Sequence, residues 1–402
     1  MIAPVDQRID ALDALRGFAV LGILVMNIQT FAMPMAAYLN PTAYGSLDGI
    51  HGLVWAVGHV LADQKMMALF SLLFGAGIVL FCERARASGR SEAAYHYRRN
   101  LWLMLFGMAH GYLLWSGDIL FVYALCAFVL FPLRNRSSRS LFKLGIIFLA
   151  VSSIFYLLTG VSLEFMGPEA VQEELLPAWQ PDSALIDAEI AAMQGNWMTQ
   201  LTARIPLTQD MHGPALLLWG FWRASGMMLL GMAMYKSRVL TGLSDNSVYR
   251  RLIWLAVLVG VPMVVVGIYW NFQNNWQISS MFFGSQFNYW GSVLISLGFM
   301  SAILLLLKNG IVPALTNRLA AVGRMAFSNY IMHTLICGLI FYGHGLGLMG
   351  EIERAGQLLI VLGIWALQLW LSPIWLRHFR FGPLEWLWRS LTYWKLQPMR
   401  VA

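Results

Sequence analysis

The stretch LDALRGFAVLGILVMNIQTFAMP, residues 12–34, decides the fold class of this chain. Its length and apolar character are those of a membrane-spanning helix, which needs about 20 such residues. Arg16 lies at its entrance, where an arginine either snorkels to the lipid headgroups or binds a ligand. Asn27 follows eleven residues later, about 16 Å along a helix that rises about 1.5 Å per residue. At that depth an amide either joins helices or lines a polar cavity, so both alternatives place Asn27 against protein.

The composition is that of a protein with many membrane spans. Of the 402 residues, 58% are hydrophobic and 12% are charged, whereas soluble domains contain about 45–50% apolar residues. Residues 1–15 are polar and precede no small-residue cleavage site, so we expect the first helix to be a retained anchor. Cys82, Cys126 and Cys337 are isolated from one another and from histidine clusters. We therefore interpret them as packing residues and predict no metal site.

Apolar runs of spanning length recur along the chain and predict about ten crossings. They lie near residues 14–34, 62–82, 100–116, 118–133, 143–162, 214–235, 252–271, 283–307, 324–343 and 356–376. Lys and Arg collect in every second loop, near residues 84–99, 134–143, 236–251, 308–324 and 377–400. Because basic loops remain in the cytoplasm, we predict an all-α polytopic bundle whose N- and C-termini are both cytoplasmic. The net charge of +7 follows from this topology, and we expect no nucleic-acid partner.

We interpret residues 1–402 as one transmembrane domain with two appendages. The acidic residues 162–213 predict an extracytoplasmic cap that contains an amphipathic helix near residues 183–201. Residues 377–402 predict a cytoplasmic tail. Residues 49–62 are expected to lie in the outer interface or to bend back into the protein, because another full crossing would invert every later loop.

Two features bear on how the spans pack. Ser71, Gly75 and Gly77 form a small-residue stripe in the second span, which predicts close contact with another helix. Arg223 lies deep inside a later span, where it needs a carboxylate or several carbonyl oxygens as partners. Asp118 and Asp63 are both candidate carboxylates, and the sequence does not choose between them.

The predicted helical hairpin of residues 101–132 contains two ionisable residues, His110 and Asp118, close together in the sequence. Asp118 is expected at its outer mouth, with His110 about two turns deeper on the adjoining helix. A histidine at membrane depth is either an interhelical hydrogen-bonding group or a functional residue, and a nearby carboxylate would orient its ring. We expect the two side chains to pair and to leave the second ring nitrogen of His110 facing a cavity.

The segment GRMAFSNYIMHT, residues 323–334, opens the ninth span. Arg324 is expected at the cytoplasmic mouth, and Asn329 and His333 are four residues apart, so they share one helix face. The chain contains no phosphate-binding P-loop, dinucleotide fingerprint, zinc-protease motif or serine-hydrolase motif. ATP-driven transport and the familiar soluble hydrolase chemistries are therefore disfavoured.

Residues 8–28 resemble the first helix of the YeiB-like bacterial membrane proteins, and residues 323–330 resemble their carboxy-terminal motif. The resemblance extends over essentially the whole chain, with further matches at residues 70–77 and 107–120. These proteins are similar in turn to the transmembrane acyltransferase superfamily. That superfamily includes the acyltransferase type three proteins, which modify surface polysaccharides, and the lysosomal heparan acetyltransferases. The resemblance implies that an acyl group passes from a cytoplasmic acyl-CoA to an acceptor across the membrane.

One position departs from the pattern of the acyltransferase type three proteins. Their entrance arginine is followed by ten residues and then by a proposed catalytic histidine, whereas here Asn27 stands eleven positions after Arg16. The heparan acetyltransferases are similar to this chain in having asparagine there, and they rely on a histidine in the following outer segment. The first histidine after Asn27 in this chain is His51. Either His110 or His51 takes the catalytic role, or the chain transfers no acyl group.

The leading hypothesis is an acyl-CoA-dependent O- or N-acyltransferase in the cytoplasmic (inner) membrane of a bacterium. Arg16 and Arg324 would bind the phosphates of acyl-CoA, because guanidinium groups pair bidentately with phosphate oxygens. His110 would act as the base, oriented by Asp118, and Asn27 would donate to the developing oxyanion. The acceptor would be an envelope glycan, a lipid or a small molecule.

We expect His110, Asn27 and His333 to line one polar tunnel that opens beside Arg16. Arg223, Asn329 and His51 are further candidates for its polar lining. The alternative function is a transporter or channel for a small solute or lipid intermediate, which the same buried polar groups would serve.

Overall fold

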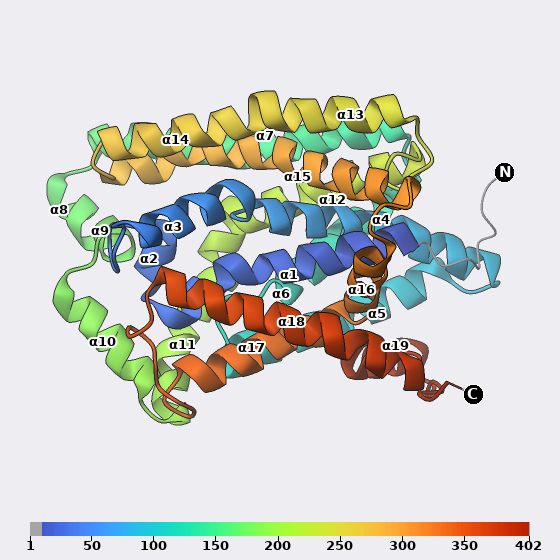
Figure 1. The fold of residues 1–402 in the computed structure, drawn as a ribbon. Coiled ribbons are helices and arrows are strands. Elements are labelled where there is room, and N and C mark those ends of the chain that lie inside the picture. Colours follow the sequence, from blue (N-terminus) through green and yellow to red (C-terminus); the bar gives the residue numbers. More distant parts are fainter. Residues whose placement is uncertain (1–9, 402) are drawn as a thin grey trace.

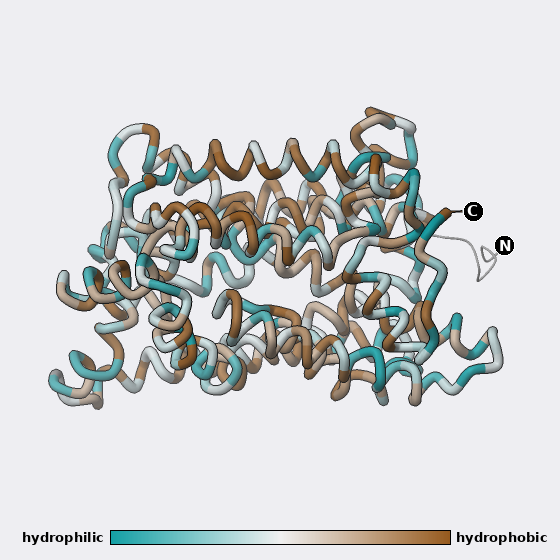
Figure 2. The backbone as a smooth tube through the Cα atoms, turned by 90° about the horizontal axis from the view of Figure 1, so that it is seen from below, coloured by the Kyte–Doolittle hydropathy of each residue, from teal (hydrophilic) through white to brown (hydrophobic). Residues whose placement is uncertain are grey.

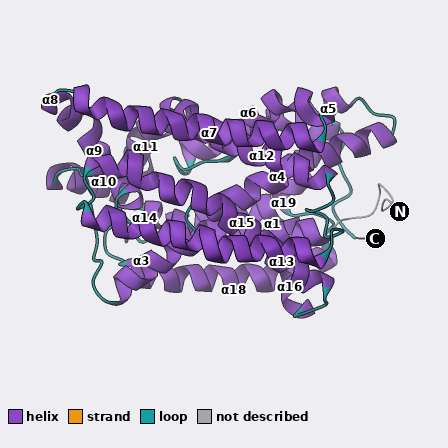
Figure 3. Ribbon diagram, turned by 90° about the horizontal axis from the view of Figure 1, so that it is seen from above, coloured by secondary structure: helices purple, strands orange, loops and turns teal. Residues whose placement is uncertain are grey.

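The computed structural model describes residues 10–401, and within that range the regular elements are helices apart from one isolated β-bridge between Phe379 and Arg400. Long helices run side by side, and loops gather mainly at the two ends of the bundle (Figures 1 and 3). The α-helices are α1 (Asp10–Ala32), α2 (Met35–Leu39), α3 (Ile50–Leu61), α4 (Lys65–Ala87), α5 (Glu92–Leu113), α6 (Leu120–Leu130), α7 (Ser138–Ser162), α8 (Pro168–Ala170), α9 (Leu176–Trp179), α10 (Ser183–Gln194), α11 (Trp197–His212), α12 (Phe221–Lys236), α13 (Asn246–Leu255), α14 (Val261–Gln273), α15 (Ser285–Lys308), α16 (Pro313–Arg324), α17 (Ala326–Phe341), α18 (Arg354–His378) and α19 (Pro383–Tyr393). Short 3-10 segments lie at Phe131–Asn135 and Leu163–Phe165, and π-helical turns lie at Val171–Leu175, Leu216–Gly220, Ala256–Gly260 and Ser280–Gly284.

The helices confirm a polytopic membrane bundle. Within the described residues, seven continuous helical stretches are long and apolar enough to cross a membrane: Asp10–Ala32, Ile50–Ala87, Ser138–Phe165, Trp197–Lys236, Asn246–Gln273, Ser280–Lys308 and Arg354–His378. Two apolar stretches are shorter, Leu120–Asn135 and Ala326–Phe341, and α5 adds a helix of 22 residues with a charged first half. Each of the ten predicted spans falls on one of these helices.

The two ends of the bundle differ in charge and in content. Both described termini lie at the end that carries α19 and the α4–α5 turn, and α8, α9 and α10 lie at the opposite end (Figure 1). We call these the basic end and the cap end. Hydrophilic residues concentrate at the two ends, and hydrophobic residues fill the middle of the helices (Figure 2). The concentration of Lys and Arg at the basic end predicts that this end faces the cytoplasm.

Two segments at the cap end refine the predicted boundaries. Helix α3 runs on into α4 through a turn at Gln64, whose φ is 60°, so residues 49–62 form no crossing of their own (Figure 1). The amphipathic helix predicted over residues 183–201 is interrupted at Gly195, and this prediction was wrong in its length. Asn196 begins a new helix because its side chain accepts the N–H groups of Met198 and Thr199.

Helix α1 lies in direct backbone contact with α16. A Cβ atom on Gly17 would lie 1.9 Å from a carbonyl oxygen of α16, and one on Gly323 would lie 1.8 Å from a carbonyl oxygen of α1. Only glycine permits such an approach, so this pair fixes the entrance of α1 against the end of α16. Because Arg16 and Arg324 adjoin these glycines in the sequence, the contact holds both arginines at the basic end.

Helix α4 approaches α12 in the same way. A Cβ atom on Gly75 would lie 2.0 Å from the carbonyl oxygen of Met228. The hydroxyl of Ser71 lies 2.7 Å from the hydroxyl of Tyr123, so it also contacts a neighbouring helix. Gly77 has no neighbouring atom within 4 Å of an added Cβ. The predicted close-packing stripe is therefore confirmed for Ser71 and Gly75 and wrong for Gly77.

This difference predicts the stability of two alanine variants on one helix. Gly75→Ala is expected to destabilise the protein by about 1–3 kcal/mol, because the methyl group forces α4 and α12 apart. Gly77→Ala is the matched control and should not lower the unfolding temperature. Thermal unfolding of each purified variant, followed by tryptophan fluorescence, measures the effect. Equal unfolding temperatures for the two variants would contradict the close contact at Gly75.

Candidate functional site

A cavity of about 600 Å³ lies at the basic end, between α1, α4, α5, α6, α16, α17 and α19. Its volume is within the range of small-molecule sites, about 300–1,000 Å³. Six of the described residues that line it are arginines: Arg16, Arg84, Arg90, Arg99, Arg324 and Arg389. Two carboxylates line it, Asp13 and Glu385. The cavity therefore favours an anionic ligand.

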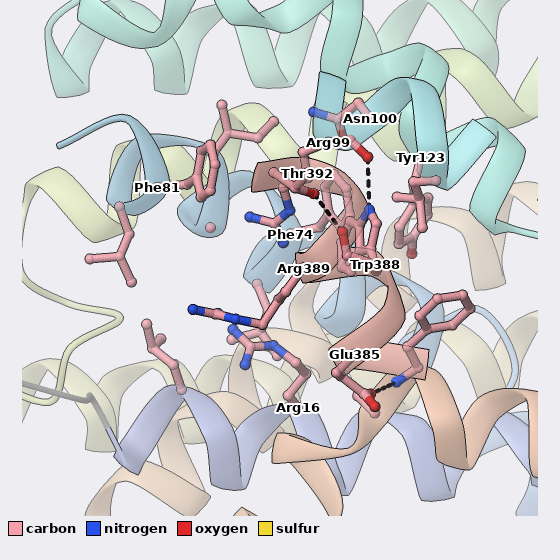
Figure 4. Close-up of a pocket in the computed structure, with 18 of the residues that line it drawn as sticks. Arg16, Phe74, Phe81, Arg99, Asn100, Tyr123, Glu385, Trp388, Arg389 and Thr392 are labelled. Atoms are coloured by element: carbon pink, nitrogen blue, oxygen red, sulfur yellow. Dashed lines mark hydrogen bonds between the residues drawn. The ribbon is translucent and has the colours of Figure 1, made fainter. Parts of the chain in front are cut away.

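Arginines from three helices project into the same space. Figure 4 shows Arg16 of α1, Arg99 of α5 and Arg389 of α19 around one cavity. The guanidinium of Arg99 lies 4.3 Å from the ring centroid of Trp388, and that of Arg389 lies 4.5 Å from the ring of Phe381. Contact with an aromatic ring restricts where a guanidinium can lie, so these contacts hold Arg99 and Arg389 at the cavity wall.

Helix α19 closes one side of the cavity and is anchored by Glu385. The Oε1 atom of Glu385 accepts the backbone N–H groups of Phe327 and Ser328, at 2.7 and 3.1 Å, in the first turn of α17. The Ser328 hydroxyl donates to Oε2 at 2.5 Å. Burial raises the pKa of the Glu385 carboxyl, and these hydrogen bonds oppose the shift. The segment predicted as a cytoplasmic tail thus contains a helix that builds the site.

Removal of this anchor is expected to release α19. Glu385→Ala should make the chain after Gly382 far more sensitive to limited proteolysis, because it leaves N–H groups at the start of α17 without their acceptor. Glu385→Gln retains a carbonyl oxygen and serves as the matched control with a smaller effect. Cleavage followed by mass spectrometry gives the rates, and equal rates for wild type and Glu385→Ala would contradict the anchoring role.

His110 and Asp118 pair as the hairpin predicted. The Nδ1 atom of His110 lies 2.7 Å from Oδ1 of Asp118. Oδ2 of the same carboxylate accepts the N–H of Phe121 at 2.8 Å, in the first turn of α6. The expectation that the second ring nitrogen faces a cavity was wrong, because Nε2 lies 2.9 Å from the hydroxyl of Thr334 on α17. His212 of α11 approaches the carboxylate from its other side, with Nε2 3.9 Å from Oδ2.

The cavity ends one helical turn short of these groups. Along α17 its last lining residue is Tyr330, whose ring centroid lies 5.3 Å from that of His110. Along α1 the last lining residue is Ile23, four positions before Asn27. His110, Asn27 and His333 are not among the lining residues, so the prediction that they line one tunnel was wrong for this cavity. Arg16 and Arg324 do line it together, as the sequence predicted.

Asn329 and His333 share the face of α17 that packs against α18. The Nε2 atom of His333 lies 2.9 Å from Oε1 of Gln368, and Nδ2 of Asn329 donates to the hydroxyl of Ser372 at 3.1 Å. These contacts join two helices inside the bundle. His51 lies elsewhere, where its Nδ1 accepts the backbone N–H of Ala355 near the start of α18 at 3.4 Å.

Arg223 is fully buried and takes oxygen partners other than carboxylates. It donates to the carbonyl oxygen of Tyr289 at 2.8 Å and to the hydroxyl of Ser292 at 2.5 Å. Neither Asp118 nor Asp63 forms an ion pair with Arg223. The sequence predicted either a carboxylate or carbonyl oxygens as partners, and the structure shows a carbonyl oxygen.

A second buried polar cluster joins α4 to α15. Lys65 donates to the side-chain oxygen of Asn288 and to the carbonyl oxygen of His59. The amide of Asn288 donates to Asp63 at 2.7 Å, and His59 lies 3.1 Å from the same carboxylate. Lys65 and Asn288 lie 223 positions apart, so the sequence gives no sign of their contact, which forms only where α4 and α15 lie side by side.

The arginines of the cavity were identified from the sequence only in part. Four of them lie in or near basic loops, where the sequence predicts only which side of the membrane the loop occupies: Arg84, Arg90, Arg99 and Arg389. Residues 383–393 do contain a sequence pattern that indicates part of the cavity wall. Glu385, Trp388, Arg389 and Thr392 recur at spacings of three and four, which is the period of a helix face. That face lines the cavity (Figure 4).

The chain is similar to uncharacterized bacterial proteins over nearly its full length. Residues 234–395 match the family described as "Protein of unknown function (DUF418)". The chain is 35% identical over 398 residues to "Uncharacterized protein YeiB" of Escherichia coli (strain K12), with 96% of both chains covered. It is 32% identical over 404 residues to "Uncharacterized protein YxaH" of Bacillus subtilis (strain 168), covering 98% of this chain and 96% of that protein. It is 27% identical over 399 residues to a 39.9 kDa protein of Bacillus acidopullulyticus.

Proposed function

The chain belongs to the YeiB-like family of membrane proteins, and we propose that it transfers an acyl group from cytoplasmic acyl-CoA to an acceptor on the outer side of a bacterial cytoplasmic membrane. Acyl-CoA acts as a co-substrate in this proposal. The acceptor is a hydroxyl or amine of an envelope glycan, a lipid or a small molecule.

The observation that carries the proposal is the cavity at the basic end. Its six arginines face a space whose inner end reaches Tyr330, which packs against His110. An acyl-CoA has the matching polarity, since its phosphates lie at one end and its thioester at the other. Phosphates bound by Arg16, Arg324 and their neighbours would direct the thioester toward the middle of the membrane.

The residues at the inner end fit the chemistry of acyl transfer. His110 is held by a buried carboxylate, which fixes its tautomer and stabilises the imidazolium that forms when it accepts a proton. Asn27 lies one turn beyond the last cavity residue of α1, and in this proposal its amide donates to the oxyanion. The acceptor approaches from the cap end, where α11 adjoins the hairpin of α5 and α6.

A carrier for a small polar solute is the second candidate. The buried cluster of Lys65, Asn288 and Asp63 favours it, because ionisable groups at membrane depth are typical of substrate and proton paths. A carrier would move solute into protein-containing vesicles without consuming acyl-CoA, and that uptake would depend on Lys65 rather than on His110.

The deciding experiment uses the purified full-length protein in lipid nanodiscs. We expect it to bind radiolabelled acetyl-CoA, to bind it more weakly as salt is raised, and to prefer it over dephospho-CoA derivatives, because the arginines contact phosphates. Lipid and glycan mass spectrometry of a deletion strain then identifies the acceptor. If the wild-type protein neither binds nor cleaves acetyl-CoA, the proposed function is wrong.

A further inference from the structure

A third side chain, Thr334, joins the pair of His110 and Asp118 by a hydrogen bond. The acyl-transfer roles described above give Thr334 no part. The hydroxyl of Thr334 lies 2.9 Å from Nε2 of His110, whose Nδ1 lies 2.7 Å from Asp118. The three side chains are nearly inaccessible, with exposed fractions of 4%, 0% and 2% for Thr334, Asp118 and His110. They come from α17, the α5–α6 turn and α5, so the tertiary fold brings them together.

The charge of the Asp118 carboxylate determines which groups donate in the two hydrogen bonds of His110. An ionised carboxylate only accepts, so a neutral imidazole beside it carries its proton on Nδ1 and has Nε2 as an acceptor. The Thr334 hydroxyl then donates to Nε2. This is the arrangement in which a histidine base removes a proton from a hydroxyl nucleophile while a buried acid holds the ring.

The hydroxyl of Thr334 differs from those of several other helical threonines in the described chain. A threonine inside a helix usually donates to a carbonyl oxygen three or four residues earlier. Thr159, Thr202 and Thr392 each do so, at 2.9, 3.1 and 2.7 Å. Among the described residues, Thr334 has His110 as its one side-chain hydrogen-bond partner. Its hydroxyl is therefore committed to the imidazole and not to its own helix.

The other histidines lack this combination. His59 also adjoins a carboxylate, at 3.1 Å from Asp63, but no hydroxyl bonds its second nitrogen. His333, next to Thr334 in the sequence, pairs with a neutral amide of α18. Of the chain's histidines, all of which the structure describes, His110 alone has a carboxylate on one ring nitrogen and a hydroxyl on the other.

The position of Thr334 suits a carrier of the acyl group. It lies one turn beyond Tyr330 on α17, where the cavity ends, and therefore on the cap side of the phosphate-binding arginines. Tyr330, where the cavity ends along α17, and His110 beyond it are 4% and 2% exposed. A covalent intermediate would let the acyl group pass Tyr330 alone while the nucleotide stays on the cytoplasmic side.

We propose that Thr334 is the nucleophile that holds the acyl group between donor and acceptor, which rests on the acyl-transfer function proposed above. His110 takes the proton of Thr334 as its oxygen attacks the thioester carbonyl. The carbon–sulfur bond breaks, and the departing sulfur receives that proton from His110, which releases free CoA. In the second step an acceptor hydroxyl or amine gives its proton to His110 and attacks the ester. The Thr334 oxygen leaves and regains the proton.

The test is to trap the intermediate in the full-length protein. Purified protein is incubated with radiolabelled acetyl-CoA without acceptor, quenched in acid and mapped by peptide mass spectrometry. We expect one acetyl group on the peptide that contains Thr334, in wild type and in Thr334→Ser. Thr334→Val, which has the same shape and no hydroxyl, should carry no label and should lose transfer by at least about 10²-fold, with acetyl-CoA binding unchanged.

Two control variants complete the design. Thr159→Val removes a hydroxyl that bonds its own helix and should label normally. Cys337→Ser tests the thiol three residues after Thr334, and it too should label normally. Thr334→Ser also covers the case in which Thr334→Val fails to fold, because the serine variant keeps the hydroxyl.

The outcomes separate this inference from the proposed function. Transfer by wild type with no label on Thr334, or with label lost in Cys337→Ser, would overturn the Thr334 intermediate and leave acyl transfer standing. Full transfer activity of Thr334→Val would also overturn the Thr334 intermediate and leave acyl transfer standing. Failure of the wild type to bind or cleave acetyl-CoA would overturn both.

Discussion

The His110→Ala variant is expected to transfer acyl groups about 10²–10⁴-fold more slowly than wild type, the contribution typical of a positioned general base. Its affinity for acyl-CoA should be unchanged, because His110 lies beyond the inner end of the cavity and does not line it. Single-turnover kinetics and equilibrium binding, measured on the same preparation, distinguish the two effects. A parallel loss of binding would show that His110 holds the cavity together and has no catalytic role.

Asp118→Asn is expected to reduce transfer almost as strongly. An amide at this position retains the size of the side chain and the contact with the N–H of Phe121, but it removes the charge that stabilises the imidazolium. Asp210→Asn, on an exposed part of α11, is the control and should transfer at the wild-type rate. Wild-type activity in Asp118→Asn would exclude a histidine base that depends on this carboxylate.

Arg324→Ala is expected to weaken acyl-CoA binding about 10–100-fold. A hydrogen bond to a charged group contributes about 1.5–3 kcal/mol, and each 1.4 kcal/mol corresponds to about tenfold in affinity. Arg16→Ala should have at least as large an effect, because Arg16 also neutralises Asp13, whose Oδ1 lies 2.7 Å from its Nη1. Loss of the arginine removes positive charge that offsets the Asp13 carboxylate on the cavity wall, so phosphate is repelled more strongly.

The chain provides a matched control for this prediction. Arg318 lies on α16 with Arg324 but outside the cavity, where it donates to the carbonyl oxygen of Leu369. Arg318→Ala should bind acyl-CoA as wild type does. Isothermal titration at two salt concentrations measures the affinities, and the difference between Arg324→Ala and wild type should shrink at high salt. Equal affinities for all three proteins would remove Arg324 from the ligand site.

The sequence by itself determined the fold class, the spans and the pairing of His110 with Asp118. Spans are predictable because hydrophobicity over about 20 residues is a local property, and a bilayer leaves helices as the way to satisfy the backbone of each span. The side of each loop follows from its own lysines and arginines. The pair was predictable because eight residues and one tight turn separate its members.

Only the tertiary structure determines which side chains from different helices meet to form the cavity and the buried polar clusters. Thr334 reaches His110 across 224 positions, and no property of either segment alone encodes that contact. In the sequence the arginines of the cavity resemble ordinary loop charges, and backbone contacts such as that of Gly17 with α16 bring the helices that carry them to one end. The sequence allowed Arg223 either a carboxylate or carbonyl oxygens, and the packing of α12 on α15 gives it the carbonyl oxygen of Tyr289. The same reason applies to all three cases. Which side chains on different helices come into contact depends on how the helices pack, and the sequence of one helix does not specify that packing.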